Sequence, residues 1–132
     1  MNLRDLNREQ KNIIVLFGIS IVFWLSLVFY REYYKKDVKM MRQNILGACN
    51  GWCLGHFIHY TLLSYCAPSY WVELIIIGFI FELIEVPLNS LSKYIDSKIY
   101  EDTITNTLGV LTGILLYKLY PMNIDLIRLI RK

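Results

Sequence analysis

Three pairs of polar side chains lie inside strongly apolar stretches of the chain. The pairs are His56 with His59, Glu82 with Glu85, and Asp102 with Asn106. Each pair has a spacing of three or four residues, which places both members on one face of an α-helix. An ionisable group at membrane depth costs about 2.5–3.5 kcal/mol and needs a partner or a water-filled cavity. We therefore expect the three pairs to meet in one polar pocket.

The residue types of this pocket suit acid–base catalysis and cation binding. His56 is the candidate general base, with His59 in support, and Glu82 is the third candidate catalytic residue. Carboxylate and amide oxygens suit Ca²⁺ or Mg²⁺, whereas two histidines with carboxylates suit zinc, manganese or iron. The sequence does not choose between these ions. The candidate cation ligands are Glu82, Glu85, Asp102 and Asn106, and Asn50 is expected to line the pocket with the last three of them.

Four apolar segments must position these residues. They cover residues 12–30, 45–67, 70–87 and 104–120, and segments of this length suit the hydrocarbon core of a bilayer. Pro68 separates the second segment from the third by so short a link that the two are expected to form a central antiparallel hairpin. The first segment has anchoring as its only evident task.

The composition favours a membrane protein over a soluble domain. The chain has 132 residues, of which 55% are hydrophobic, more than a soluble core of this size could hide. Its net charge is only +3, and the basic residues form short tracts beside apolar segments, which argues against nucleic-acid binding. We expect one all-α, polytopic membrane domain over residues 1–132, with four transmembrane helices and membrane lipids as its surroundings.

The segments outside the spans do not fix the orientation. Residues 31–44 form a basic loop at headgroup level, and residues 122–132 form a short amphipathic tail that is expected to lie on the membrane surface. Lysines and arginines are equally numerous on the two sides of the predicted bundle. The excess of positive charge that marks a cytoplasmic side is therefore missing.

The glycines and cysteines are interpreted as packing residues. Glycines repeat every fourth residue in two places, and such stripes let helices pack closely within a chain or between the chains of a homo- or hetero-oligomer. The cysteines at 49, 53 and 66 show no spacing typical of a disulfide framework or a zinc site, and we expect them to be small packing residues. The glycine stripes are Gly47, Gly51 and Gly55, and Gly109 and Gly113.

The polar motifs, taken in order, resemble the VanZ-like membrane proteins. The resemblance covers residues 54–120 and is closest to an uncharacterised bacterial inner-membrane branch of that family. It implies a membrane protein whose best-known relative protects bacteria against a glycopeptide antibiotic that binds lipid-linked cell-wall precursors. The motifs are Gly55-His56-Phe57-Ile58-His59, Glu82-x-x-Glu85 and Tyr100-x-Asp102-x-x-x-Asn106-x-x-Gly109-x-x-x-Gly113.

A fainter likeness exists to base-exchange phosphatidylserine synthases. Those enzymes also have a Gly-His-Phe element, a Glu-x-x-Glu helix and an Asn-rich glycine helix in this order. They are much longer, and they carry a tryptophan and aspartate cluster where this chain reads Lys98-Ile-Tyr-Glu-Asp102. Most of that cluster is absent here.

Three functions follow as hypotheses. The first is a VanZ-like protein whose pocket binds a phospholipid or lipid-linked headgroup and, if it is an enzyme, transfers or hydrolyses that headgroup with a divalent cation. The second is a non-catalytic assembly or structural subunit that docks partner helices through its glycine stripes. The third is proton or ion transport, which is disfavoured because four helices leave little room for a pathway.

Overall fold

The computed structural model describes residues 6–34, 38, 41, 44–46, 49–91 and 99–130. Within this part the chain is mostly helical, which confirms the all-α class. Gly47 and half of the predicted basic loop lie outside the described residues. The elements are α1 (Arg8–Tyr34), β1 (Asn44–Leu46), β2 (Cys49–Asn50), α3 (Gly51–Cys66), the 3₁₀ helix η1 (Pro68–Tyr70), α4 (Trp71–Leu91), α5 (Ile99–Leu119) and α6 (Leu126–Ile130).

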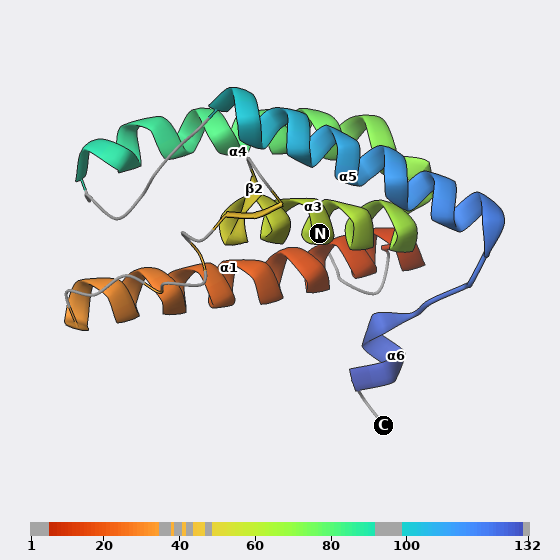
Figure 1. Ribbon diagram of the computed structural model, residues 1–132. Coiled ribbons are helices and arrows are strands. Elements are labelled where there is room, and N and C mark those ends of the chain that lie inside the picture. Colours follow the sequence, from red (N-terminus) through yellow and green to blue (C-terminus); the bar gives the residue numbers. More distant parts are fainter. Residues whose placement is uncertain are drawn as a thin grey trace.

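The four long helices pack side by side with alternating direction (Figure 1). Helix α3 lies in the middle, with α1 on one side and α4 and α5 on the other. The chain reverses at Pro68 as predicted, but α3 packs mainly against α5 and only lightly against α4. The central pair of the bundle is therefore α3 with α5, and not the two arms of the hairpin.

Glycines explain why α5 approaches α3 so closely. A Cβ atom added at Gly109 would lie 2.7 Å from the carbonyl oxygen of Phe57. One added at Gly113 would collide with Ser64 Oγ and with the backbone oxygen of Thr61. Only hydrogen fits at both positions, so the two backbones come within a distance that larger residues would prevent.

The helix bounds differ from the apolar segments in a consistent way. Helix α1 extends past both ends of segment 12–30, α4 continues through Pro87 to Leu91, and α5 begins at Ile99, before segment 104–120. Hydropathy marks where apolar residues begin, whereas the helix also includes polar turns beyond them. Helix α3 is the exception, because it starts at Gly51 and not at residue 45.

The late start of α3 has a local cause. Strands β1 and β2 form a short antiparallel pair in which Asn44 lies opposite Asn50. Asn50 then caps α3, because its side-chain oxygen accepts a hydrogen bond from the backbone N–H of Cys53 at 3.0 Å. An asparagine in extended conformation at this position is a strong helix start.

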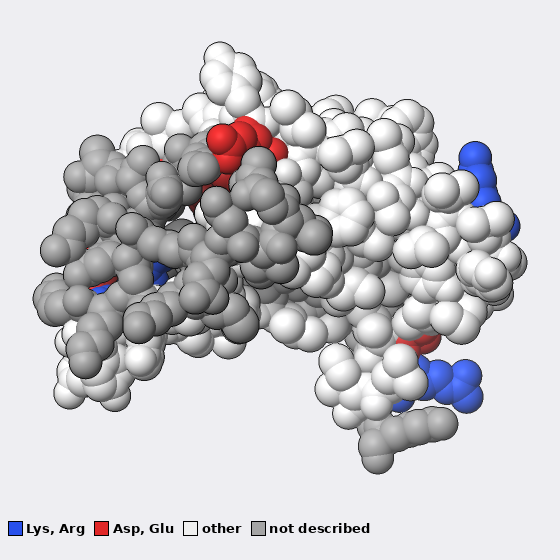
Figure 2. Space-filling view, viewed as in Figure 1, with Lys and Arg blue, Asp and Glu red and all other residues white. Residues whose placement is uncertain are grey.

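The interior is small, and much of it is polar. Its apolar cluster consists of Tyr60, Leu63, Leu74 and Val110. Large apolar side chains instead cover the outside of α1, α4 and α5. Figure 2 shows a broad white surface in this view, with the charged residues of the described part gathered in a few places. The buried polar residues are Asn12, Arg31, Ser64, Glu82, Glu85, Asp102 and Asn106.

Helix α1 is, within the described residues, the one helix long and apolar enough to cross a membrane by length and composition. Its most apolar stretch has no buried residue. Helix α3 has 16 residues, about 24 Å at 1.5 Å per residue, and the first turn of α5 carries Glu101 and Asp102. Membrane association is therefore supported through α1, and the crossing of the other helices stays a prediction.

The C-terminal segment is tied to the bundle by one asparagine. Asn12, which is fully buried, donates from Nδ2 to the carbonyl oxygens of Cys66 at 3.1 Å and Ile124 at 2.9 Å. Its Oδ1 accepts from the backbone N–H of Leu126 at 3.0 Å. This side chain thus joins α1, the end of α3 and the start of α6, so part of the predicted tail is anchored to the protein.

Candidate functional site

A chain of hydrogen bonds joins the three helices α3, α4 and α5. Asn106 of α5 donates from Nδ2 to Oε1 of Glu82 on α4 at 2.9 Å. The Oδ1 atom of the same amide lies 3.0 Å from Nδ1 of His56 on α3. Nδ1 of His56 is also 3.6 Å from Oε1 of Glu82. The structure therefore brings together three residues that the sequence placed in one pocket.

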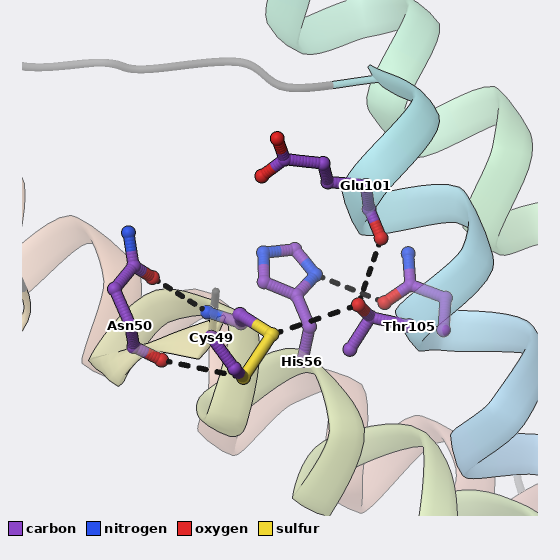
Figure 3. Close-up of a disulfide and its surroundings, with 7 residues drawn as sticks. Cys49, Asn50, His56, Glu101 and Thr105 are labelled. Carbon is purple, nitrogen blue, oxygen red and sulfur yellow. Dashed lines mark hydrogen bonds between the residues drawn. A yellow bond between two sulfur atoms is a disulfide. The ribbon is translucent and has the colours of Figure 1, made fainter. Parts of the chain in front are cut away.

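This arrangement selects one form of the histidine ring. A carboxylate accepts hydrogen bonds, so the amide of Asn106 must turn its N–H groups toward Glu82 and its oxygen toward His56. That oxygen requires a hydrogen on Nδ1, which leaves Nε2 of a neutral ring as an acceptor. In Figure 3 the second ring nitrogen of His56 points away from α5. His56 thus has the tautomer that a general base needs.

Two further carboxyl groups lie beside this chain. Glu85 and Asp102 are both buried, each 7% exposed. The charges of Glu82, Glu85 and Asp102 lie close enough to act on one another. Oε2 of Glu82 is buried and has no hydrogen-bond partner within the described residues. Because like charges repel strongly in a medium of low dielectric constant, a positive ligand would relieve this cluster.

A cavity of about 260 Å³ opens beside the cluster, between α1, α3 and α4. Its walls are mainly aromatic and aliphatic, and its polar members are few. The lining residues on α1 are Phe17, Ser20, Ile21, Phe23 and Trp24; those on α3 are Trp52, Gly55, His56, His59 and Tyr60; those on α4 are Phe81, Ile84 and Glu85. An apolar pocket with a few convergent polar groups is the usual form of a small-molecule site.

His59 faces the same cavity and has its own partner. Its Nδ1 lies 2.8 Å from Oγ of Ser20 on α1, so either atom can donate. The ring also contacts Phe17 edge-on, with 5.4 Å between the ring centres. Among the described residues, His59 is linked by hydrogen bond to Ser20 and not to His56. The two histidines therefore line one cavity while their partners come from different helices.

The beginning of α3 carries a disulfide that the sequence analysis did not expect (Figure 3). Cys49 and Cys53 are bonded to each other, so the interpretation of both as packing residues was wrong. Sγ of Cys53 lies 3.7 Å from Oγ1 of Thr105, which places the bond against the first turns of α5. Cys66 is free and buried, as a packing residue would be.

The remaining predicted site residues lie in several places. Asn50 caps α3 and is not among the residues that line the cavity. Gly51 is the first residue of α3. Gly55 is exposed at the cavity, and an added Cβ atom there would meet nothing within 4 Å, so it does not make the tight contact expected of its stripe.

No cation site is evident among the described residues. In that part of the chain, no three side chains of His, Cys, Asp or Glu are grouped so that they could hold a metal ion. The predicted ligands Glu82 and Asn106 bond to each other. A divalent cation at Glu82, Glu85, Asp102 and Asn106 stays a prediction.

Sequence reasoning missed the contribution of α1 to the site. Ser20 binds His59, and Arg31, only 2% exposed, places its guanidinium 5.5 Å from the ring centre of Trp52. A single serine in an apolar segment gives no periodic signal. Arg31 has the position of an ordinary headgroup-level cation, so only the packing of α1 on α3 could show its role.

Comparison with known proteins adds no assignment to this geometry. No family model, no curated protein and no solved structure matches the chain. The VanZ-like resemblance stays a prediction that rests on the motifs at residues 54–120.

Proposed function

We propose that this chain is a multi-pass membrane protein of VanZ-like type whose cavity binds the headgroup of a phospholipid or lipid-linked molecule. The membrane part of the proposal is supported by the distribution of polarity. Large apolar side chains cover the outside of the helices, whereas carboxyl, amide and guanidinium groups are buried. Lipid as the surrounding solvent explains this distribution, because apolar surface costs nothing there and polar groups must find partners inside.

One observation carries the headgroup assignment. The buried chain of His56, Asn106 and Glu82 ends at the wall of a 260 Å³ cavity whose other walls are largely apolar. A molecule that is polar at one end and apolar along its length fits such a cavity. A lipid is the most abundant molecule of this kind around a membrane protein.

His56 is the proposed catalytic residue, and Asn106 and Glu82 position it. With Nδ1 bonded to Asn106, Nε2 of the ring can accept a proton from a headgroup hydroxyl or from a water molecule. Glu82 stabilises the imidazolium that would form, through Asn106 and through its own Oε1 atom 3.6 Å away. The reaction class is transfer or hydrolysis of the headgroup, in which the activated oxygen would attack phosphorus, the bond from phosphorus to the leaving oxygen would break, and the proton on Nε2 would pass to that oxygen.

A non-catalytic role as an assembly subunit is less well supported. In that role the glycine stripes would contact a partner helix. Gly109 and Gly113 instead face α3 of the same chain, where they leave no room for another helix. Gly55 faces the open cavity. Gly109 and Gly113 thus make a contact within this chain, and Gly55 lines its cavity.

Lipid profiling tests the proposal. Membranes are extracted from cells that express wild type, His56→Ala or Glu82→Gln at matched levels, and headgroups are measured by mass spectrometry. Glu73→Gln is the matched control, because Glu73 is an exposed carboxylate on the same helix as Glu82. We expect a headgroup change in wild type and in the control that both site variants abolish. An unchanged profile in all samples, with folded proteins, would refute headgroup modification.

A second assay, with purified protein, tests whether the reaction needs a cation. Purified protein is incubated with lipid in the presence of a chelator and then with added Mg²⁺ or Ca²⁺. Loss of the reaction with the chelator and recovery with one ion would support the predicted cation. Full activity in the chelator would show that the reaction needs no divalent cation.

A further inference from the structure

Two polar groups at the cavity, Glu85 and His56, offer hydrogen-bond acceptors, whereas the serine, tyrosine and tryptophan side chains of the lining can donate. Glu85 is the one lining residue with a carboxylate, and lysine and arginine are absent from the described lining. His56 offers Nε2 as an acceptor, because Nδ1 is committed to Asn106. Oε2 of Glu82, beside them, is buried and has no hydrogen-bond partner in the described part of the chain. This wall therefore favours a ligand that brings hydrogen-bond donors and positive charge.

An ordinary phosphate group does not meet this requirement. A phosphodiester carries negative charge and accepts hydrogen bonds, so it would be repelled by Glu85 and by the two carboxyl groups beside it. Arg31 could offset part of that repulsion, but it stacks on Trp52 and is not a lining residue. An ammonium group has three donors and a positive charge, which match the acceptors of this wall.

The aromatic walls favour the same ligand. Trp24 and Phe81 also line the cavity, and ring faces attract ammonium groups. Gly55 lines the cavity and is exposed, and an added Cβ atom there would meet nothing within 4 Å. A lipid with an amine at the tip of its headgroup can thus insert that tip while its chains stay along the apolar outer faces of α1 and α4.

On these grounds we infer that the cavity selects a lipid whose headgroup ends in an amine, and that Glu85 binds that amine, which leaves Nε2 of His56 to act as the base. This inference rests on the proposed function and deepens it. The lipid is preferred to a soluble amine because the cavity has mostly apolar walls, and a free amine would leave them without a partner.

A retention experiment tests the headgroup. The full chain is placed in nanodiscs that contain equal amounts of phosphatidylethanolamine and phosphatidylglycerol with identical acyl chains. After mild solubilisation, the lipids that stay bound are counted by native mass spectrometry. We expect wild type to retain the ethanolamine lipid about tenfold over the glycerol lipid, as the loss of one charge-assisted hydrogen bond implies. Glu85→Gln should abolish the preference, and Glu73→Gln should keep it.

The outcomes separate the inference from the proposed function. Equal retention of both lipids by wild type, or an unchanged preference in Glu85→Gln, overturns the amine assignment. If wild type retains the glycerol lipid and His56→Ala loses it, the headgroup site stands and only its amine selectivity falls. Retention of neither lipid overturns both. The wild-type ratio decides alone if Glu85→Gln does not fold.

A soluble competitor separates the two sources of an amine. A large excess of glycerophosphoethanolamine, which carries the headgroup without acyl chains, is added to the lipid-bound protein. We expect the bound lipid to remain, because the apolar walls contribute to its affinity. Complete displacement would show that the site takes the free amine, and would overturn the lipid as its ligand.

Discussion

Asn106 is the residue on which the geometry of the site depends. It bonds to His56 with one end of its amide and to Glu82 with the other. Its i, i+4 spacing from Asp102 predicted a shared helix face, and both residues are indeed buried. The sequence could group these residues because helical spacing is regular. It could not show that Asn106 lies between His56 and Glu82, because that order depends on how three helices pack.

Asn106→Ala should destabilise the protein by about 1–2 kcal/mol, because both neighbours lose a buried hydrogen-bond partner. The change should also lower headgroup activity, since the ring of His56 loses the group that fixes its tautomer. Thermal unfolding in detergent and lipid profiling measure the two effects. Asn123→Ala, at an exposed position after α5, is the control and should behave as wild type. An Asn106→Ala protein with wild-type stability would contradict the hydrogen-bond chain.

At the scale of the elements, α3 and α5 form the tightest contact. The glycine spacing predicted close packing, and the short link at Pro68 predicted that α4 would be the partner of α3. Close packing is present at Gly109 and Gly113, but the partner is α5. A short connection makes two helices antiparallel without deciding how much surface they share. That share depends on which faces carry small residues.

Gly113→Ala should lower the stability by about 1–3 kcal/mol, because the added methyl group meets backbone atoms of α3 that cannot move aside. Gly18→Ala is the matched control: Gly18 is also helical, but its Cβ would meet nothing within 4 Å. That change should be neutral or stabilising by up to about 1 kcal/mol. Equal effects of the two substitutions on thermal unfolding would show that α3 and α5 are not in contact at Gly113.

The Cys49–Cys53 bond fastens β2 to the first turn of α3. Sequence reasoning could not identify it, because the spacing of the cysteines is not typical of a disulfide framework. We expect the unfolded, unreduced chain to take up one alkylating group at Cys66, and the reduced chain to take up three. Intact-protein mass spectrometry counts the groups, and Cys49→Ser should take up two without reduction. Three groups on unreduced wild type would exclude the disulfide.

At the scale of the whole molecule, the disulfide predicts how the protein is oriented in the membrane, which the distribution of basic residues does not. Disulfides persist in oxidising compartments, and this one lies at the start of α3, where Cys53 contacts Thr105 near the start of α5. We therefore expect the start of α3 and of α5 to face the oxidising side of the membrane. The sequence alone could not settle this, since its charges are balanced between the two sides.

Cysteine labelling tests the orientation and the crossing of α5 together. Single cysteines at Glu101→Cys and Lys118→Cys, in a chain whose own cysteines are serine, lie at opposite ends of α5 and are exposed. In bacterial spheroplasts, a membrane-impermeant maleimide should react with the first, and with the second only after permeabilisation. Labelling of both from one side would show that α5 does not cross the membrane.

The central claim is that the cavity between α1, α3 and α4 holds a lipid, and photo-cross-linking tests it most directly. A phosphatidylethanolamine with a photoreactive group on its glycerol backbone, next to the headgroup, is bound to the protein, and the cross-linked peptides are mapped by mass spectrometry. Gly55→Trp should fill the cavity, whereas Leu108→Trp places the same ring on the exposed face of α5. The account predicts cross-links to the cavity walls that Gly55→Trp removes and Leu108→Trp leaves intact. Cross-links confined to outer faces, and indifferent to Gly55→Trp, would contradict it.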